Sequence, residues 1–466
     1  MRLGWSAMFA LGISGIARAQ DQDGVKDLLE RVRKLEEREA VREKAAPPTW
    51  DSSRMLSFAS ADGSFTAKVG GRIYLNYRHI FDRDDGSGGD VDTFFLDTAR
   101  LQADGTFFKD FFYRVELEAQ TSTGTQTVDI DEGPGVTNVT ITAGRGRPQL
   151  KDTYLGWTIV PEHLSLQGGQ MKTPWSQEET CSSRFIDFGE RSLLNRLAPA
   201  HDMGLLFRGS FAEKIFEWSL GVFNGAFVRD GGRNSPDTND EKDAVGRLFI
   251  TPFRTSGAKF IEQLRIGGDF TVGDRDDLPV AGASVTAGDL GVGVVNPIAG
   301  GGFTADGLQT RYLFNASWIY GPASLRAEYA VVNTELNDAA PEGDFDITAY
   351  YLQGTLLLTG EDKPLENRIK PRATLNLSEG TFGAFELAAR IARVDTSDGE
   401  DAGVVAATAN PKTTEVTLGV NWWWTPNVAL RINWERLSYD EDRLVGSGDS
   451  LEDKQDIFYV RWQIDF

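Results

Sequence analysis

The stretch GGRIYLNYR (residues 70–78) decides the fold, because its side chains change character at every step. Polar or amphipathic residues hold one set of alternate positions and apolar or aromatic residues hold the other: Arg72, Tyr74, Asn76 and Arg78 alternate with Ile73, Leu75 and Tyr77. A period of two is the period of a β-strand. The same alternation returns in residues 311–318 and 428–435, and in the final FYVRWQIDF (residues 458–466).

Strands of about ten residues with one apolar and one polar face are typical of a membrane β-barrel, which has lipid outside and water inside. A soluble sandwich shows the same alternation with its apolar face turned inward. The alternation alone therefore leaves both architectures open. The lengths of the connections between strands distinguish them.

Short connections alternate with long ones along the chain. The short ones lie near residues 109–110, 161–162, 213–214, 321–322 and 426–427, and the long ones are 82–92, 121–150, 172–200, 224–243, 274–308, 334–345, 395–412 and 440–455. Outer-membrane barrels have tight periplasmic turns and large outer loops, so we predict a transmembrane antiparallel β-barrel of about 16 strands. Residues 360–381 depart from the rule, because this basic connection is long where a short turn is due. It is a second candidate to enter the bore.

Composition and charge exclude other classes of protein. The chain has 466 residues, 40% of them hydrophobic, and a formal net charge of −21. Its mean hydropathy is −0.32, and past the N-terminus it lacks the roughly 18 apolar residues that a membrane-spanning helix needs. Nucleic acid is disfavoured as a partner, because phosphate binding requires a basic face. The acidic charge fits three roles: it could keep large exposed loops soluble, bridge through divalent cations to anionic surface lipid, or give the protein a preference for cations.

Two segments precede the predicted barrel, which spans residues 64–466. Residues 1–19 have the features of a signal peptide: a positive start at Arg2, an apolar run and the A-x-A site that ends at Ala19. Residues 20–48 predict a short helix with apolar positions spaced 3-4-3, too few heptads to establish a coiled coil. A solvated charged helix and a short oligomerising or wall-contacting stalk both fit this pattern.

The irregular stretch GGQMKTPWSQEETCSSRFIDFGERSLLNRLAPAHDM (residues 168–203) interrupts the alternating strands. It is too long for a turn, and it mixes lysine and arginine with glutamate and aspartate. We expect it to fold into the barrel and narrow the bore. Its acids Glu178, Glu179 and Glu190, beside its cations, predict a constriction of mixed charge.

Several ordered stretches of the chain resemble the phosphate-selective porin O and P family. They are FTAKVGGRIYLNY from residue 65, GTFFKDFFYRVELE from residue 105, GQMKTPW with SSRF and ERSL in residues 169–194, LLLTGE with IKP in residues 356–371, GAFELAAR from residue 383 and TLGVNWWWTPNV from residue 417. The resemblance implies a 16-stranded, usually trimeric outer-membrane channel that infolded loops narrow and basic residues line. It places Arg72 on the family's Gly-Gly-Arg position and residues 168–200 on its constriction loop.

Two departures from the family pattern weaken the assignment of phosphate as the solute. Phosphate-specific members carry two adjacent arginines in the second strand, where this chain has Asp97 and Thr98. A lysine of the constriction loop is replaced by Glu179. Both changes remove positive charge, so a general or cation-tolerant porin remains an alternative.

If the polar faces line the bore, many charged side chains point into it. We expect most arginines to pair with acids across strands, and a few near the constriction to meet solute, with Arg72, Arg100, Lys172 and Arg184 as candidates free of acidic partners. Charged rings of this kind set the selectivity of a pore. The predicted pore-lining or solute-binding cations are Arg72, Arg100, Arg114, Lys172, Arg184, Arg191, Arg265 and Arg311.

Other motifs predict little chemistry. Residues 422–424 are three tryptophans at a strand end, which suits anchoring at the membrane interface; an inward Trp423 would suit sugar stacking. The acidic residues 82–92 fail the EF-hand pattern of calcium sites. The chain offers no catalytic motif, so we expect no enzyme, no cofactor and no bound metal.

The sequence therefore predicts a passive channel for small charged solutes, phosphate or other anions among them, in contact with outer-membrane lipid and assembled as a homotrimer. The rival hypothesis is a structural envelope protein, in which the barrel anchors an N-terminal stalk. A barrel enzyme has no supporting residues.

Overall fold

The computed structural model describes most of the chain. The described residues are 26–27, 29–37, 49–51, 55–81, 90–119, 123–130, 137–144, 148–225, 240–279, 285–287, 292–295, 304–337, 340, 343–401, 412–444 and 451–466. The predicted signal peptide and most of the acidic stretch 82–92 lie outside them. Residues 26–27 and 29–37 are helical, within the segment predicted to be a helix, and they expose Leu29, Val32 and Leu35.

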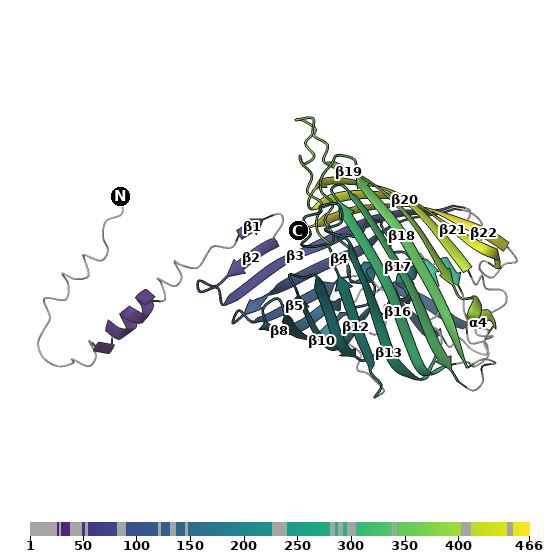
Figure 1. Cartoon of the computed structure of the whole chain (residues 1–466), viewed down its shortest axis with the longest axis horizontal. Coiled ribbons are helices and arrows are strands. Elements are labelled where there is room, and N and C mark those ends of the chain that lie inside the picture. Colours follow the sequence, from purple (N-terminus) through teal and green to yellow (C-terminus); the bar gives the residue numbers. More distant parts are fainter. Residues whose placement is uncertain are drawn as a thin grey trace, which may run out of the picture.

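Across the described residues, sixteen antiparallel strands form one closed wall (Figure 1). They are β3 (Phe65–Ile80), β4 (Val91–Phe107), β5 (Phe111–Glu118), β8 (Gln149–Val160), β9 (Leu164–Lys172), β10 (His201–Phe211), β11 (Phe216–Phe223), β12 (Asp243–Ile250), β13 (Arg265–Pro279), β16 (Thr304–Tyr320), β17 (Ala323–Leu336), β18 (Asp344–Leu357), β19 (Ala384–Asp395), β20 (Lys412–Thr425), β21 (Val428–Leu444) and β22 (Leu451–Asp465).

The last strand closes the barrel on the first. β22 pairs with β3 from Ile457 opposite Ile80 to Asp465 opposite Arg72. Closure removes the open edges that a sheet cannot keep in hydrocarbon, where every backbone amide needs a partner. The predicted β-barrel is therefore confirmed, and the soluble sandwich is wrong.

Short strands extend the wall or lie apart from it. β1 (Thr49–Asp51) and β2 (Met55–Ala59) form a hairpin, and β2 pairs with the start of β3, beyond the reach of β22. β6 (Thr123–Ile130) pairs with β7 (Thr137–Gly144), and β14 (Val285–Ala287) pairs with β15 (Val292–Val295), in two separate sheets. The remaining elements are α3 (Gln177–Thr180), α4 (Ser397–Asp401) and the 3-10 turn η1 (Leu193–Leu197).

The outer face of the wall is apolar. Phe94 and Phe314 are 74% and 68% exposed, whereas Arg72 and Arg326, on the opposite face, are 3% and 4% exposed. This is the orientation that the alternating sequence predicts, with lipid outside. None of the described helices is long and apolar enough to cross a membrane.

Aromatic rings gather where the short turns connect the strands. Phe211 stacks on Phe216 with ring centroids 4.7 Å apart, and Trp424 contacts Trp462 at 5.9 Å. Rings of this kind sit at the membrane interface, which agrees with the anchoring role predicted for residues 422–424. Trp423 is the exception, because it points inward and lies 4% exposed in a cluster with Ile369. Its burial rules out the sugar-stacking role.

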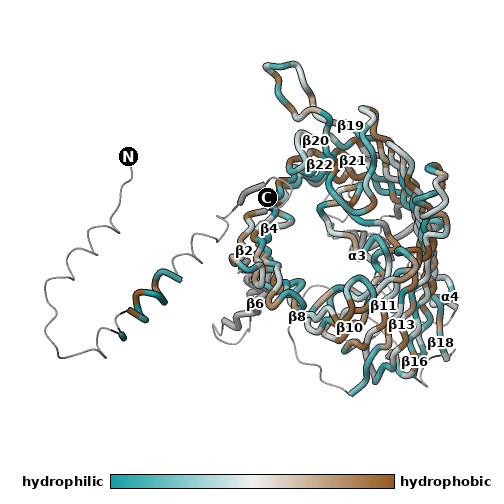
Figure 2. Tube along the Cα trace, turned by 60° about the vertical axis from the view of Figure 1, so that its left-hand side comes forward, coloured by the Kyte–Doolittle hydropathy of each residue, from teal (hydrophilic) through white to brown (hydrophobic). Residues whose placement is uncertain are grey.

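Two connections enter the barrel from opposite ends. Residues 173–200, called here the infolded loop, leave β9 and return to β10, and Figure 2 shows their helix α3 inside the ring of strands. Residues 358–383, called here the long turn, connect β18 to β19. Lys363 and Ile369 of the long turn are 5% and 2% exposed, so the prediction that this basic connection enters the bore is confirmed.

Candidate functional site

The infolded loop is held at its base by two neighbouring strands. Lys172, the last residue of β9, pairs with His201, the first of β10, and the Thr173 amide donates to the Ala200 carbonyl at 3.2 Å. The loop therefore leaves and rejoins the wall at nearly one point. Its residues between these ends lie within the bore, where packing and hydrogen bonds to the wall must hold them.

One side of the loop is apolar and packs on an apolar part of the inner wall. Trp175 and Leu194 are fully buried and belong to one cluster with Val332, Ile347 and Val394 of β17, β18 and β19. Fully burying a leucine side chain contributes about 1.5–3 kcal/mol. This packing presses the loop against one half of the barrel and leaves the other half for passage. Part of the inner wall is therefore apolar, and the loop supplies its apolar partner.

Carboxylates and amides of the wall accept hydrogen bonds from the loop backbone. The Ser176 amide donates to Asp269 at 2.9 Å, and its hydroxyl donates to Glu328 at 2.7 Å. The Gly189 amide donates to the Asn433 side chain at 2.7 Å. Buried amides without partners are costly, so these wall groups fix the loop backbone in place.

Gly189 also lies where the loop passes closest to the wall. A Cβ atom at this position would stand 2.1 Å from the ring of Tyr459. Only glycine allows this approach, so the residue lets the loop reach β22.

The polar side of the loop faces a cavity that the opposite wall completes. Strands β3, β4, β5, β8 and β22 supply most of the rest of its lining, together with Lys172 and His201 at the ends of β9 and β10. Nine arginine and lysine side chains and six carboxylates surround the cavity: Arg72, Arg100, Arg114, Lys151, Lys172, Arg184, Arg191, Arg196 and Arg461 stand against Asp97, Glu116, Glu118, Asp152, Glu179 and Glu190. The constriction therefore carries mixed charge with an excess of cations.

Most of the predicted site residues come together in this cavity. Eight of them line it: Arg72, Arg100, Arg114, Lys172, Arg184 and Arg191, with the acids Glu179 and Glu190. Glu178 is elsewhere, since it accepts from the Ser192 hydroxyl at 2.6 Å behind the loop. Arg265 lies beside Glu217 near the short turns, and Arg311 lies 4.0 Å from Asp243 on another part of the wall.

The prediction that four of these cations are free of acidic partners is wrong. Arg72 pairs with Glu116, Arg100 with Glu116 and Glu118, Lys172 with Glu179 at 3.4 Å, and Arg184 with Asp465 at 3.7 Å. These side chains are only 4–18% exposed, and a buried charge requires a partner. The pairing expected for most arginines therefore extends to the constriction.

Two cations, Lys172 and Arg191, contact the loop and lower the pKa of its Glu179 carboxyl. Lys172 and Arg191 lie 3.4 Å and 3.7 Å from the Glu179 carboxylate, and Arg191 also donates to the Cys181 carbonyl at 2.9 Å. Burial raises the pKa of Glu179, but these cations outweigh burial and hold it well below its ordinary value. Glu179 is therefore ionised at neutral pH.

Arg184 shows the opposite balance. Burial, helped by the nearby charge of Arg72, lowers the pKa of the Arg184 guanidinium to about 10. The group remains protonated at neutral pH and keeps its positive charge beside the cavity. Burial likewise raises the pKa of the Cys181 thiol to about 11, which makes the thiol unreactive at neutral pH.

Arg461 joins the wall to the loop. Its Nη2 atom donates to Asp97 at 2.9 Å and lies 3.5 Å from Glu190. Asp97 occupies one of the two positions where phosphate-specific porins carry arginine, and here it neutralises a cation of the cavity. Residue spacing gave no sign of this contact, because Asp97 and Arg461 are 364 positions apart.

Relatives of known identity share this architecture. The family model described as phosphate-selective porin O and P matches residues 68–466. Porin O of Pseudomonas aeruginosa is 24% identical over 439 residues, which are 88% of this chain and 91% of that protein.

Solved structures of outer-membrane proteins show the same fold. OmpT of Vibrio cholerae in its trimer form is 12% identical, with a TM-score of 0.51 over 86% of this chain and 100% of OmpT. The channel DcaP of Acinetobacter baumannii is 11% identical, with a TM-score of 0.51 over 87% and 99% of the two chains. OmpF of Salmonella typhi, solved with daunomycin, is 10% identical, with a TM-score of 0.51 over 86% and 98%.

The family match covers the wall from Lys68 of β3 to the end of β22, together with the infolded loop and the long turn. Its members span the outer membrane as channels, and the closed barrel has the apolar outer face that this location requires. The chain is thus an outer-membrane channel that belongs to the phosphate-selective porin O and P family.

Proposed function

We propose that this channel passes small anions by diffusion with a weak preference over cations. The observation that carries the proposal is the lining of the constriction, where nine arginine and lysine side chains outnumber six carboxylates. A ring of net positive charge raises the local concentration of anions. Phosphate and small organic anions are the solute classes that this charge favours.

The mechanism needs no energy source. The guanidinium groups that a diffusing anion meets already have carboxylate partners. The anion must therefore compete with these carboxylates for the guanidinium hydrogen bonds. Arg114 and Arg191 are accessible enough for this, because their side chains are 35% and 21% exposed. Competition from their carboxylate partners, Asp152 for Arg114 and Glu179 for Arg191, keeps the interaction weak, which suits rapid passage.

Reversal potentials in planar bilayers test the proposal. With a gradient of potassium chloride across the bilayer, we expect a potential of the sign that chloride permeation produces. Arg191→Gln should reduce the anion preference, whereas Arg254→Gln, at an exposed position between β12 and β13, should leave it unchanged. A cation-selective potential would refute the anion assignment and favour the general, cation-tolerant porin; a protein without conductance would contradict the proposal altogether.

We also propose that the functional unit is a homotrimer. OmpT of Vibrio cholerae, which shares the fold, is described in a trimer form. The mass of the detergent-solubilised protein, measured by light scattering, tests this.

Deleting residues 20–46 tests the rival role as an envelope anchor: lost envelope integrity with unchanged solute uptake would support that role for the N-terminal helix.

A further inference from the structure

Two arginines of the constriction stand directly opposite each other on neighbouring strands. Arg72 of β3 faces Arg100 of β4 in the strand register, and both side chains line the cavity. Like charges at facing positions of a sheet repel each other, because their Cβ atoms are only about 5 Å apart. The two guanidinium groups therefore require an anion beside them.

Glu116 of β5 supplies that anion. Its Oε1 atom accepts hydrogen bonds from both guanidinium groups, from Nη2 of Arg72 and from Nη1 of Arg100 at 3.4 Å. The Glu116 side chain is 5% exposed and lines the cavity. Arg100 has a second carboxylate partner in Glu118. Among the described residues, however, Glu116 is the only carboxylate that pairs with Arg72.

The arginine pair has hydrogen-bonding capacity that Glu116 does not use. The Nε atom of Arg72 is buried without a hydrogen-bond partner among the described residues, and its Nη1 atom donates to the Ser182 hydroxyl of the infolded loop at 2.9 Å. A single oxygen of Glu116 accepts from both guanidinium groups. A free oxyanion such as phosphate has more acceptor oxygens, and guanidinium groups bind oxyanions through two parallel hydrogen bonds. It therefore has the acceptors to satisfy this pair more fully than Glu116 does.

The infolded loop brings a third arginine to the same place. Nη1 of Arg184 donates to the Gln102 side chain at 3.1 Å, and Nη2 donates to the Gly71 carbonyl at 3.4 Å. Gln102 faces Glu116 in the register of β4 and β5, and Gly71 directly precedes Arg72. Arg184 therefore adds positive charge beside the carboxylate that the other two arginines share.

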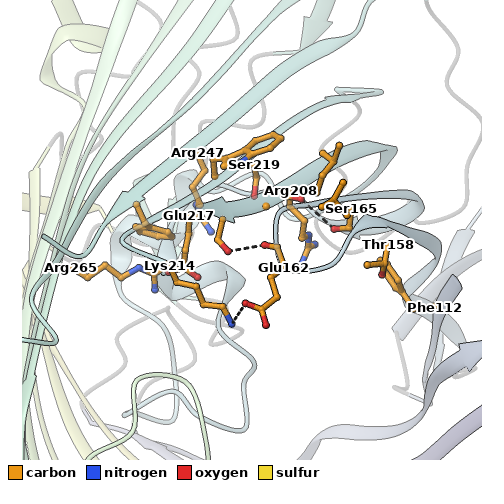
Figure 3. Close-up of a pocket in the computed structure, with 16 residues that line it drawn as sticks. Phe112, Thr158, Glu162, Ser165, Arg208, Lys214, Glu217, Ser219, Arg247 and Arg265 are labelled. Carbon is orange, nitrogen blue, oxygen red and sulfur yellow. Dashed lines mark hydrogen bonds and ion pairs between the residues drawn. The ribbon is translucent and has the colours of Figure 1, made fainter. Parts of the chain in front are cut away.

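Two arginines of another pocket in the bore have one carboxylate each. Figure 3 shows this pocket, which lies near the short turns and has Arg247, Arg265 and Glu217 in its lining. Arg247 makes two hydrogen bonds of 2.8 Å to Asp269, and Arg265 lies 3.6 Å from Glu217. Each acid here neutralises one cation. Glu116 differs, because it bridges two cations that face each other.

From this arrangement we infer that the constriction contains an oxyanion site between Arg72 and Arg100, and that Glu116 occupies this site as a tethered competitor. The inference rests on the proposed function, in that a permeating anion reaches the cavity. Because the carboxylate is attached to the wall, its effective concentration at the site is high, and phosphate or a carboxylate solute must displace it. Chloride has no oxygen atoms with which to bridge two guanidinium groups. Glu116 is therefore a specificity-determining residue that weakens the binding of oxyanions in particular.

Block of the chloride current by inorganic phosphate tests the inference. The full-length protein is placed in planar bilayers in potassium chloride at neutral pH, and the phosphate concentration that halves the current is measured. We expect Glu116→Ala to lower this concentration at least tenfold, because the alanine vacates the site and leaves Arg72 without a counter-charge. Phosphate should also raise the unfolding temperature of this variant more than that of the wild type.

Glu217→Ala is the matched control, because it removes a carboxylate of the bore that pairs with a single arginine. Its half-blocking phosphate concentration should equal the wild-type value. An equal decrease in both variants would attribute the effect to the net charge of the bore and overturn the inference. An unchanged concentration in Glu116→Ala would overturn it as well.

Glu116→Gln keeps the volume of the side chain and removes its charge, so it provides a second readout should Glu116→Ala fold poorly. Its half-blocking concentration should lie between those of the wild type and the alanine variant, since the amide still fills the site. A wild-type value would refute the competition, and a value as low as that of alanine would refute occupation of the site by the side chain. Cation-selective conductance would overturn the proposed function, while the effect of phosphate on the unfolding temperature would still decide this inference.

Discussion

Lys363 of the long turn forms an ion pair with Asp187 of the infolded loop. The same ammonium group also pairs with Glu386 of β19. All three side chains are at most 3% exposed. One buried cation therefore ties two connections from opposite ends of the barrel to the wall between them.

Removing this cation should loosen the constriction. Lys363→Gln would leave Asp187 and Glu386 buried without the ammonium group that pairs with both, and breaking a buried pair in this way costs about 3–5 kcal/mol. We expect a lower unfolding temperature and a noisier single-channel current. Circular dichroism during heating and bilayer recordings measure the two effects.

Lys370→Gln is the matched control, because Lys370 belongs to the same turn and is exposed. Adding Asp187→Asn to Lys363→Gln should recover part of the lost stability, since it removes one of the opposing charges. If the Lys363→Gln channel had the current noise and the unfolding temperature of the wild type, the ion pair would not be needed to keep the long turn in position.

Acid should weaken the constriction only below pH of about 4. Burial raises the pKa of Asp187 and Glu179, but neighbouring cations outweigh burial, so both carboxyls keep a pKa below the ordinary value. A carboxyl of this kind contributes stability above its unfolded pKa of about 4, and loses it as the pH falls through the folded pKa. The contribution of these two carboxyls to the unfolding temperature should therefore stay level from about pH 8 to 5 and decline below about pH 4.

An Asp187→Asn variant identifies the group responsible. It should be less stable at neutral pH and show a shallower decline in acid, because the titrating carboxyl is gone. Glu379→Gln, at an exposed position of the long turn, should reproduce the wild-type profile. A decline that begins near pH 6 would assign the acid sensitivity to other groups.

The architecture followed from the sequence because burial acts on alternate residues. Ile73 is 46% exposed to lipid and its neighbour Arg72 is 3% exposed inside, and this contrast repeats from strand to strand. Long and short connections then gave the strand number, since tight turns join strands at one end only. These patterns are local in the sequence, so a single amino-acid sequence is enough to predict the barrel.

The partners inside the bore did not follow from the sequence. Arg461 contacts Asp97, which is 364 positions away in the sequence, and Lys363 contacts Asp187, which is 176 positions away. Pairs separated this far cannot be predicted from the spacing of neighbouring residues. The apolar inner surface was also missed. The sequence does contain an indication of this surface: Ala330 and Val332 of β17 are apolar although they occupy positions that face the inside of the barrel.

Asp97 should limit the anion preference of the channel. Asp97→Asn replaces the carboxylate that accepts the 2.9 Å hydrogen bond from Arg461 with a neutral amide, and so removes one negative charge from the cavity. A unit charge about 6 Å from a permeating ion contributes about 0.7 kcal/mol in water-like surroundings. The loss of the charge favours chloride and disfavours potassium by this amount each, so the ratio of chloride to potassium permeability should rise about tenfold, as measured by reversal potentials.

Asp62→Asn controls for net charge, because Asp62 is exposed in a turn outside the strands. It should leave the permeability ratio at the wild-type value. An equal rise in both variants would attribute the effect to the overall charge of the protein and contradict a local role for Asp97.

Packing of Leu194 should decide how firmly the infolded loop is held. Leu194→Ala removes a fully buried side chain from the cluster that joins η1 to the inner wall, and such a change costs about 2–5 kcal/mol. The barrel keeps its hydrogen-bonded wall, so the loss should appear as opening of the loop. Hydrogen exchange followed by mass spectrometry should show faster exchange in residues 173–200 and unchanged exchange in the strands.

Leu377→Ala removes the same side chain from a position that is 73% exposed in the long turn, and it should leave exchange in the loop unchanged. The comparison separates two ways of holding the loop. If the backbone hydrogen bonds to Asp269, Glu328 and Asn433 held it alone, Leu194→Ala would exchange like the wild type. Faster exchange would instead show that the apolar half of the inner wall presses the loop aside and so keeps the charged half of the bore open.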